Sequence, residues 1–228
     1  MTQVTKITKS TFTFGGRSYF RGGSEDLQLG DVGEKKTPLG KPNYLAKTRS
    51  VAPDNLGKVT VSVSGPYSID WSSFSSGQVN ASIKYLNAAG AAGSFNHGAA
   101  KKYNLKLVKF SLAETPLTNL LNKHAGVARK ELDDEGADGR IVSVTFVCMH
   151  GEIASQVTRS GSVDVSAPVG GTGLVVGVGG GGSSTSGGTI VLPPGTCFAY
   201  GLHKVKKWVK RSGERFVDDM EDDLVGLT

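Results

Sequence analysis

Alternation between apolar and polar residues marks the clearest strands of this chain. Residues 58–64 alternate valine with polar residues, a period of two that is typical of a half-buried strand, and Gly65-Pro66 predicts its end. Residues 140–149 are almost continuously apolar, which predicts a central strand covered on both faces. Residues 196–200 predict a further apolar strand.

Two longer stretches share another plan, in which alternating segments flank a connector rich in small residues. The connector covers residues 87–100 within the stretch 77–110, and residues 169–188 within the stretch 151–192. Each stretch therefore predicts a long amphipathic β-hairpin. The apolar positions of their alternating segments are Val79, Ala81, Ile83, Tyr85, Tyr103, Leu105, Leu107, Ile153, Val157, Val163 and Val165.

A helix is predicted between the two stretches. Thr115 fits an N-cap and Pro116 fits the first helical position, while Gly136 fits the end. Between them, apolar residues from Leu117 to Leu132 recur at spacings of three and four, as on one face of an amphipathic helix. The elements together predict an α+β fold: a twisted, mainly antiparallel sheet with long β-hairpins and a few flanking helices.

Charge divides the chain into a basic body and an acidic tail. The net charge is +6, from 26 Lys and Arg against 20 Asp and Glu. Residues 214–228 contain six of the acidic residues and one of the basic ones, which leaves 25 basic and 14 acidic residues, or +11, in residues 1–213. We expect one β-rich domain over residues 1–212 and a helical tail over residues 213–228. The apolar positions of that tail are Phe216, Val217, Met220 and Leu224.

Catalytic and metal-binding patterns are not evident. The four histidines show no paired spacing with each other or with the two cysteines, and no Gly-x-Ser-x-Gly elbow occurs. Gly171-Thr172-Gly173 is followed by more glycine and serine, not by the helix that a dinucleotide loop must open. We therefore expect a non-enzymatic protein with no metal, cofactor or small-molecule substrate.

The two cysteines and the apolar runs bear on the compartment. Cys148 and Cys197 each lie in an apolar strand-like run, which favours two small buried thiols over a disulfide and a reducing compartment. No run of about 18 apolar residues exists, and residues 1–6 lack the apolar stretch of a secretory signal. We expect a protein that is cytoplasmic when soluble.

Residues 189–200, Thr-Ile-Val-Leu-Pro-Pro-Gly-Thr-Cys-Phe-Ala-Tyr, look like the strand entry of a known family. Together with the order of elements in residues 77–210, this segment resembles the pore-forming N-terminal domain of the gasdermins. Residues 1–57 are not matched. A bacterial-type member is expected to carry an N-terminal cysteine, whereas the first cysteine here is Cys148. We expect no sizeable C-terminal inhibitory domain, which leaves residues 213–228 as a self-masking tail or the chain as a cleaved or naturally short form.

The resemblance implies a protein that oligomerises on membranes and inserts two regions as β-hairpins of a large barrel. A membrane-spanning strand needs about 9–11 residues, and both predicted hairpins are long enough. The apolar positions of the two hairpins are then the membrane-insertion residues, and the main partners are further copies of the chain and anionic lipids. The implied lipid-binding residues are Lys101, Lys102, Lys204, Lys206, Lys207, Lys210 and Arg211.

Two other classes of protein fit the same residues. Glycine-rich strands, a basic body and extended arms in residues 1–57 also suit a self-assembling structural subunit, such as a phage or viral shell or tail component. A basic body with Tyr85, Tyr103 and Trp208 as stacking residues would suit a non-specific nucleic-acid binder. Specific nucleic-acid recognition is not expected, because no zinc finger, recognition helix or RNP-like signature is present.

Overall fold

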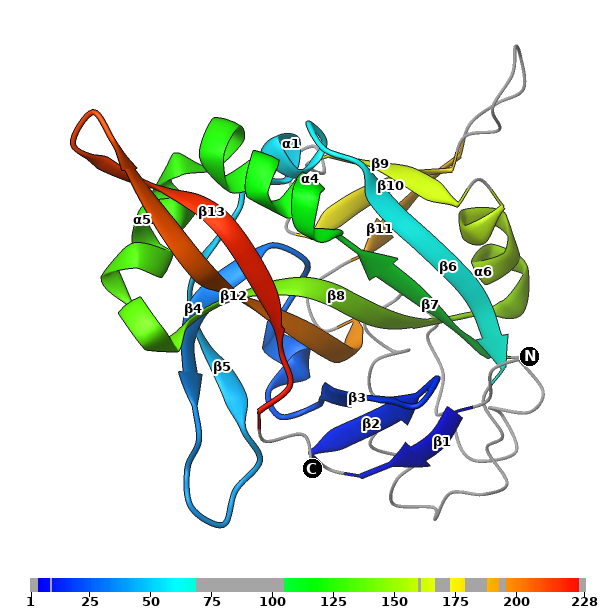
Figure 1. The fold of residues 1–228 in the computed structure, drawn as a ribbon. Coiled ribbons are helices and arrows are strands. Elements are labelled where there is room, and N and C mark those ends of the chain that lie inside the picture. Colours follow the sequence, from blue (N-terminus) through cyan, green and yellow to red (C-terminus); the bar gives the residue numbers. More distant parts are fainter. Residues whose placement is uncertain are drawn as a thin grey trace.

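The computed structural model describes residues 4–8, 10–68, 105–159, 161–166, 173–178, 188–192 and 196–225. Their strands form one twisted 13-stranded sheet (Figure 1). In chain order the strands are β1 (Val4–Ile7), β2 (Thr11–Phe14), β3 (Arg17–Phe20), β4 (Asp31–Lys36), β5 (Tyr44–Ser50), β6 (Val61–Ser68), β7 (Lys106–Ser111), β8 (Gly139–Met149), β9 (Ser162–Ser166), β10 (Leu174–Val178), β11 (Gly188–Leu192), β12 (Cys197–Arg211) and β13 (Glu214–Asp223).

The sheet is organised around β8. Along its main path the strand order is β1-β2-β3-β12-β8-β7-β6-β9-β10-β11, while β13 pairs with β12 and the β4–β5 hairpin joins through β8. These pairings are antiparallel, which confirms the predicted sheet. All 11 residues of β8 are buried, so the prediction of a central, doubly covered strand over residues 140–149 is confirmed.

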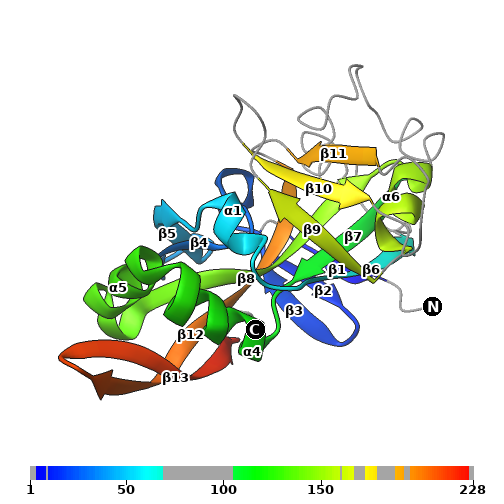
Figure 2. The ribbon, with the colours of Figure 1, turned by 90° about the horizontal axis from the view of Figure 1, so that it is seen from above.

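The helices are short and few, as predicted. They pack mainly on one face of the sheet: Leu56 of α1, Leu117 of α4 and Leu132 of α5 belong to one core cluster. Figure 1 shows α1 and α4 above β8, and Figure 2 gives the view from above. In the described residues they are η1 (Ser24–Asp26), α1 (Pro53–Leu56), α4 (Glu114–Asn119), the π-helix η3 (Leu120–His124), α5 (Gly126–Asp134), η4 (Gly136–Asp138) and α6 (Gly151–Thr158).

The helix predicted between the two stretches is present, but it consists of α4, η3 and α5 in succession. It begins at Glu114, with Ala113 and not Thr115 at the N-cap. The backbone N–H of Ala125 donates to the carbonyl of Leu120 at 2.8 Å, a five-residue step that widens the turn. The apolar face predicted from the spacing is buried, including Leu117 and Leu132.

The strand predicted to end at Gly65-Pro66 continues beyond these residues. The register of β6 against β7 passes from Ser64 opposite Lys109 to Tyr67 opposite Leu107, so β6 has one extra residue there. Such a β-bulge accommodates a proline, which has no N–H to donate to the ladder. The strand also begins at Val61, later than the predicted Lys58.

The segment predicted as a strand from Ile153 is a helix over its first half. The side chain of His150 accepts a hydrogen bond from the Glu152 N–H at the N-terminus of α6. Ala154 and Val157 are three residues apart and both buried, which fits the period of a helix. The alternation of residues 153–158 fits a strand as well, and the packing of these two side chains on the sheet selects the helix. The prediction is therefore wrong for residues 153–158, whereas the second half of the segment forms β9.

The acidic tail is a strand and not a helix. Residues 214–223 form β13, and Val217 and Met220 are both buried although they are three residues apart. A strand allows this spacing because the β12–β13 register shifts twice: Val205 lies opposite Met220, Lys207 opposite Asp219 and Trp208 opposite Val217. The irregular period that suggested a helix thus comes from β-bulges.

Two faces of the sheet are covered by different partners. One face packs against the helices, with Val108 and Val147 in the same cluster as Leu120 and Val157. The other face packs against β1–β3 through an aromatic cluster that includes Phe12, Phe14, Tyr19, Phe146 and Phe198. Both faces are therefore apolar near β7 and β8.

Tyr200 ties β12 to the N-terminal part of the chain. Its hydroxyl donates to the Gly22 carbonyl at 2.7 Å and accepts from the Leu45 N–H at 3.3 Å. Burial raises the pKa of the hydroxyl well above its usual value, so it stays protonated and can donate.

We expect Tyr200→Phe to lower the free energy of unfolding by about 1–3 kcal/mol, because it leaves the part-buried Gly22 carbonyl and the buried Leu45 N–H without this partner. Urea denaturation measures the loss. Tyr44→Phe, at a side chain that is 39% exposed, serves as the control and should change stability little. Equal losses in the two variants would contradict the role of the hydroxyl.

Candidate functional site

The two stretches predicted to form hairpins lie close together in the sheet, with one strand between their described parts. Strand β7 belongs to the first stretch, β9, β10 and β11 belong to the second, and β6 precedes the first stretch in the chain. Strand β6 pairs with β9, with Val61 opposite Val163 and Ser62 opposite Ser162. The described strands of both stretches, together with β6 between them, therefore form one continuous half of the sheet, β7-β6-β9-β10-β11.

The predicted membrane-insertion residues that the structure describes lie mostly in the core. Leu105, Leu107, Val163 and Val165 are buried. The two pairs face opposite sides of the sheet: Leu105 and Leu107 pack in the aromatic cluster, whereas Val163 and Val165 pack in the cluster that contains the helices. The remaining strand positions, Val79, Ala81, Ile83, Tyr85 and Tyr103, lie outside the described residues.

Ile153 and Val157 occupy α6, as described above, and differ in exposure. Val157 is buried against the sheet, while Ile153 is 41% exposed. The helix connects β8 to β9 and packs against β6 and β7. Any conversion of residues 151–158 to a strand requires α6 to unfold and its contacts with the sheet to break.

Three of the predicted lipid-binding lysines are neutralised by the acidic strand. Lys204 pairs with Glu221 at 2.9 Å, Lys206 with Asp219 at 2.9 Å and Lys207 with Asp218 at 2.5 Å. The hydrogen bond from Lys206 holds the pKa of Asp219 below its usual value. These ion pairs lie along the β12–β13 hairpin and reduce the positive charge that its lysines present to a partner.

The tips of two hairpins keep basic residues at the surface. Lys210 and Arg211 lie at the end of the β12–β13 hairpin, are exposed and form no ion pair within the described residues. In the loop of the β4–β5 hairpin, Leu39 is fully exposed, and Lys41 nearby is also exposed. The other predicted lipid-binding lysines, Lys101 and Lys102, lie outside the described residues.

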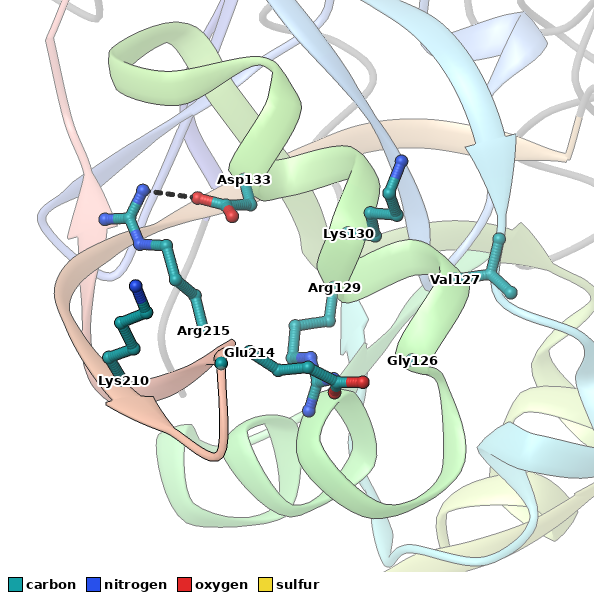
Figure 3. Close-up of a pocket in the computed structure, with 9 residues that line it drawn as sticks. Gly126, Val127, Arg129, Lys130, Asp133, Lys210, Glu214 and Arg215 are labelled. Carbon is teal, nitrogen blue, oxygen red and sulfur yellow. Dashed lines mark hydrogen bonds and ion pairs between the residues drawn. The ribbon is translucent and has the colours of Figure 1, made fainter.

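A cleft opens between α5 and the tip of the β12–β13 hairpin (Figure 3). Its volume is about 720 Å³. Two ion pairs bridge its walls: Arg129 Nη2 lies 2.9 Å from Glu214 Oε2, and Arg215 Nη1 lies 2.5 Å from Asp133 Oδ1. The full lining consists of Gly126, Val127, Arg129, Lys130, Asp133, Lys210, Gly213, Glu214 and Arg215.

Sequence reasoning identified Lys210 as a ligand-binding candidate but not the other basic residues of the cleft. Arg129 and Lys130 lie on the polar side of the predicted helix, where charged residues are usually solvated. Nothing local indicates that a hairpin more than 80 residues later lies beside them. The ion pairs of Arg129 with Glu214 and of Arg215 with Asp133 show that it does. The position of Arg129 and Lys130 on the polar side of this helix was the one sequence feature that could have marked them as candidates.

Ser143, His203 and Asp222 lie close together but lack the geometry of a catalytic triad. His203 Nδ1 is 2.6 Å from Ser143 Oγ and 3.5 Å from Asp222 Oδ1, so the serine and the carboxylate contact the same ring nitrogen. In a triad they contact opposite nitrogens. Ser143 is also completely buried, and burial lowers the pKa of His203, which favours its neutral form. This cluster is consistent with a structural role.

Both cysteines are buried free thiols, which confirms the prediction made from their apolar surroundings. Burial raises the pKa of the Cys148 thiol to about 12, and that of Cys197 also rises, chiefly because of burial. Because the thiolate is the reactive form, both side chains should resist alkylation in the folded protein.

The described part of the chain contains neither a candidate metal site nor a candidate spanning helix. No group of three or more His, Cys, Asp or Glu residues there could hold a metal ion. No helix there is long and apolar enough to cross a membrane. Comparisons with family models, curated proteins and solved structures give no match for this chain.

Proposed function

We propose that this chain is a self-oligomerising, membrane-associated pore-forming protein of gasdermin-like type, which inserts two amphipathic β-hairpins into anionic membranes. The observation that carries the proposal is the strand order β7-β6-β9-β10-β11, in which β6 alone separates the described strand of the first candidate stretch, β7, from those of the second. In a bilayer, β-hairpins must pair with further strands in a closed barrel, so that every backbone group stays hydrogen-bonded.

Chain length and patterning support the same function. Residues 162–192 are long enough for two spanning strands of about 9–11 residues joined by a turn. Within this range, β9 alternates exposed polar residues with buried Val163 and Val165. An alternating strand can expose one face to lipid and the other to a water-filled lumen. In the soluble fold the apolar face of β9 lies in the core, so insertion would exchange core contacts for lipid.

Initial attachment is assigned to the hairpin tips. Lys204, Lys206 and Lys207 are paired with carboxylates, so the exposed basic residues Lys210 and Arg211 are better placed to meet anionic lipid. Each basic residue near such a surface contributes about 1 kcal/mol. Leu39, fully exposed in the β4–β5 loop, adds an apolar contact.

Dye release tests the proposal directly. Phosphatidylcholine vesicles with and without phosphatidylserine, loaded with a self-quenching dye, are incubated with the full chain and with a chain cut at the β12–β13 turn. We expect release only from the anionic vesicles, rising steeply with protein concentration because assembly is required. Silence of both forms would refute pore formation. Regular shells or tubes formed without lipid would instead favour a structural subunit.

Fluorescent labels at adjacent positions test whether β11 inserts. Cysteines are introduced singly at the half-buried Ile190 and at Val191, which is 51% exposed, and are labelled with an environment-sensitive dye. The native cysteines are buried and should remain unlabelled. On anionic vesicles the two labels should report opposite environments, one lipid and one water, because neighbouring side chains of a strand point to opposite faces. Two water-exposed labels would contradict insertion of β11.

A further inference from the structure

We propose that the cleft between α5 and the tip of the β12–β13 hairpin binds a phosphate monoester, carried either by a lipid headgroup or by a soluble metabolite. The site is separate from the strands assigned to insertion (Figures 1 and 3). The inference does not require pore formation, because a soluble phosphate ester would use the same groups.

The charge of the lining favours a phosphate. Four basic residues, Arg129, Lys130, Lys210 and Arg215, face two carboxylates, Asp133 and Glu214, which leaves a net charge of +2. Lys130 also pairs with Asp134 outside the lining, at 3.2 Å, so the charge available to a ligand lies between +1 and +2. A phosphate monoester carries about −1.5 to −2 at pH 7 and is therefore the matching ligand class.

The two arginines are held in place without losing their hydrogen-bonding capacity. The Arg129 guanidinium lies 4.0 Å from the ring centre of Phe216, and that of Arg215 lies 5.0 Å from the ring of Trp208. Each guanidinium has five N–H donors, and one carboxylate partner does not use them all. Fixed, planar donors of this kind suit the oxygens of a phosphate.

Lys210 supplies a positive charge that is available to a ligand. It forms no ion pair within the described part of the chain, in contrast to Lys204, Lys206 and Lys207 on the same strand. Figure 3 shows Lys210 on the same wall as Arg215, across the cleft from α5. An incoming phosphate would therefore gain an ion pair there without displacing an existing one.

The size of the cleft indicates a ligand larger than a bare phosphate ion. A volume of about 720 Å³ falls within the range of small-molecule sites, roughly 300–1,000 Å³. Gly126 and Gly213 contribute no side chains to the lining, and Val127 offers an apolar contact. A sugar or inositol ring bearing phosphate groups fits this combination of charge and space.

Calorimetric titration with inositol trisphosphate tests the site on the full chain. We expect saturable binding that weakens with salt, and Lys210→Gln should weaken it by roughly tenfold, the loss of one charge-assisted hydrogen bond. The matched control is Lys207→Gln, on the same strand but paired with Asp218 and outside the lining, which should leave the affinity within about twofold. Absence of binding, or equal losses in both variants, would overturn the proposal.

Vesicle sedimentation distinguishes the two sources of the phosphate. Phosphatidylcholine vesicles with phosphatidylinositol bisphosphate present monoesters, whereas those with phosphatidylserine present diesters only. Recruitment to the former that is reduced by Lys210→Gln would assign the site to a headgroup. Trisphosphate binding without such recruitment would assign it to a soluble ester. Dye release without trisphosphate binding would refute phosphate binding by the cleft and support pore formation. Trisphosphate binding without dye release would support phosphate binding by the cleft and refute pore formation.

Discussion

Asp223→Asn should lower the free energy of unfolding by about 3–5 kcal/mol, because it leaves two buried cations without their counter-ion. Asp223 lies at the end of β13 with its side chain completely buried. Its Oδ2 accepts from Lys35 Nζ at 2.6 Å and from Arg140 Nε at 2.8 Å, and both basic side chains are at most 9% exposed. The three residues thereby join β13 to β4 and β8.

The same triad gives stability a defined dependence on pH. Burial on its own would raise the pKa of Asp223, but the hydrogen bonds and charges of Lys35 and Arg140 outweigh it and hold the pKa below its usual value. A carboxyl with a lowered folded pKa binds fewer protons when folded than when unfolded. Its contribution is therefore complete above the unfolded value of about 3.9 and is lost as the pH falls through the folded pKa.

Urea denaturation of Asp223→Asn at a series of pH values measures both effects. The difference from the unaltered chain should be largest near neutral pH and should shrink below about pH 4, where the carboxyl becomes protonated in the unaltered chain as well. Asp222→Asn provides the matched control, since the neighbouring carboxylate pairs with Arg17 at 42% exposure and should contribute less than about 1 kcal/mol. Similar losses in both variants would show that burial of the triad is not what stabilises β13.

Phe12→Ala is expected to cost about 3–5 kcal/mol through the cavity that it leaves. Phe12 is completely buried, and its ring centre lies 4.9 Å from that of Phe146 on β8 and 5.4 Å from that of Phe198 on β12, in edge-to-face arrangements. These contacts fasten the N-terminal strands to the centre of the sheet.

Thermal and urea unfolding measure the loss, and Phe12→Leu separates volume from aromatic geometry. The leucine variant keeps much of the apolar volume and should lose clearly less than the alanine variant. If β1–β3 were only loosely attached, Phe12→Ala would expose them to proteolysis without shifting the global unfolding transition. That result would contradict their role in the core.

The fold class and the central elements were accessible from the sequence because their signals are local. The apolar run over residues 140–149 predicted β8, and the spacing of Leu117, Leu120 and Leu132 predicted the helical segment that packs on the sheet. Both patterns indicate how many faces of an element are buried. The number of buried faces depends little on which other element covers them.

Predictions from local patterns were wrong where a segment fitted both the strand period and the helix period, or where a β-bulge interrupted the strand period. Residues 153–158 fit an alternating strand and a helical turn about equally well, and contacts of Ala154 and Val157 in the core select the helix. In β13 the bulges place Val217 and Met220 on one side of a strand with a spacing that suggested a helix. Neither outcome is encoded in the segment alone.

By itself the sequence determined the sheet-rich fold, the buried thiols and the presence of basic and acidic segments. Only the tertiary structure decided which charges lie opposite one another. Lys206 is neutralised by Asp219, Lys210 lines a cleft and has no ion pair among the residues that the structure describes, and Asp223 is buried between Lys35 and Arg140. The pattern of burial follows from a few neighbouring residues. Charge pairing depends on strands and helices that lie 85 to 190 positions apart in the chain. The candidate sites therefore became visible only once those distant segments were placed side by side.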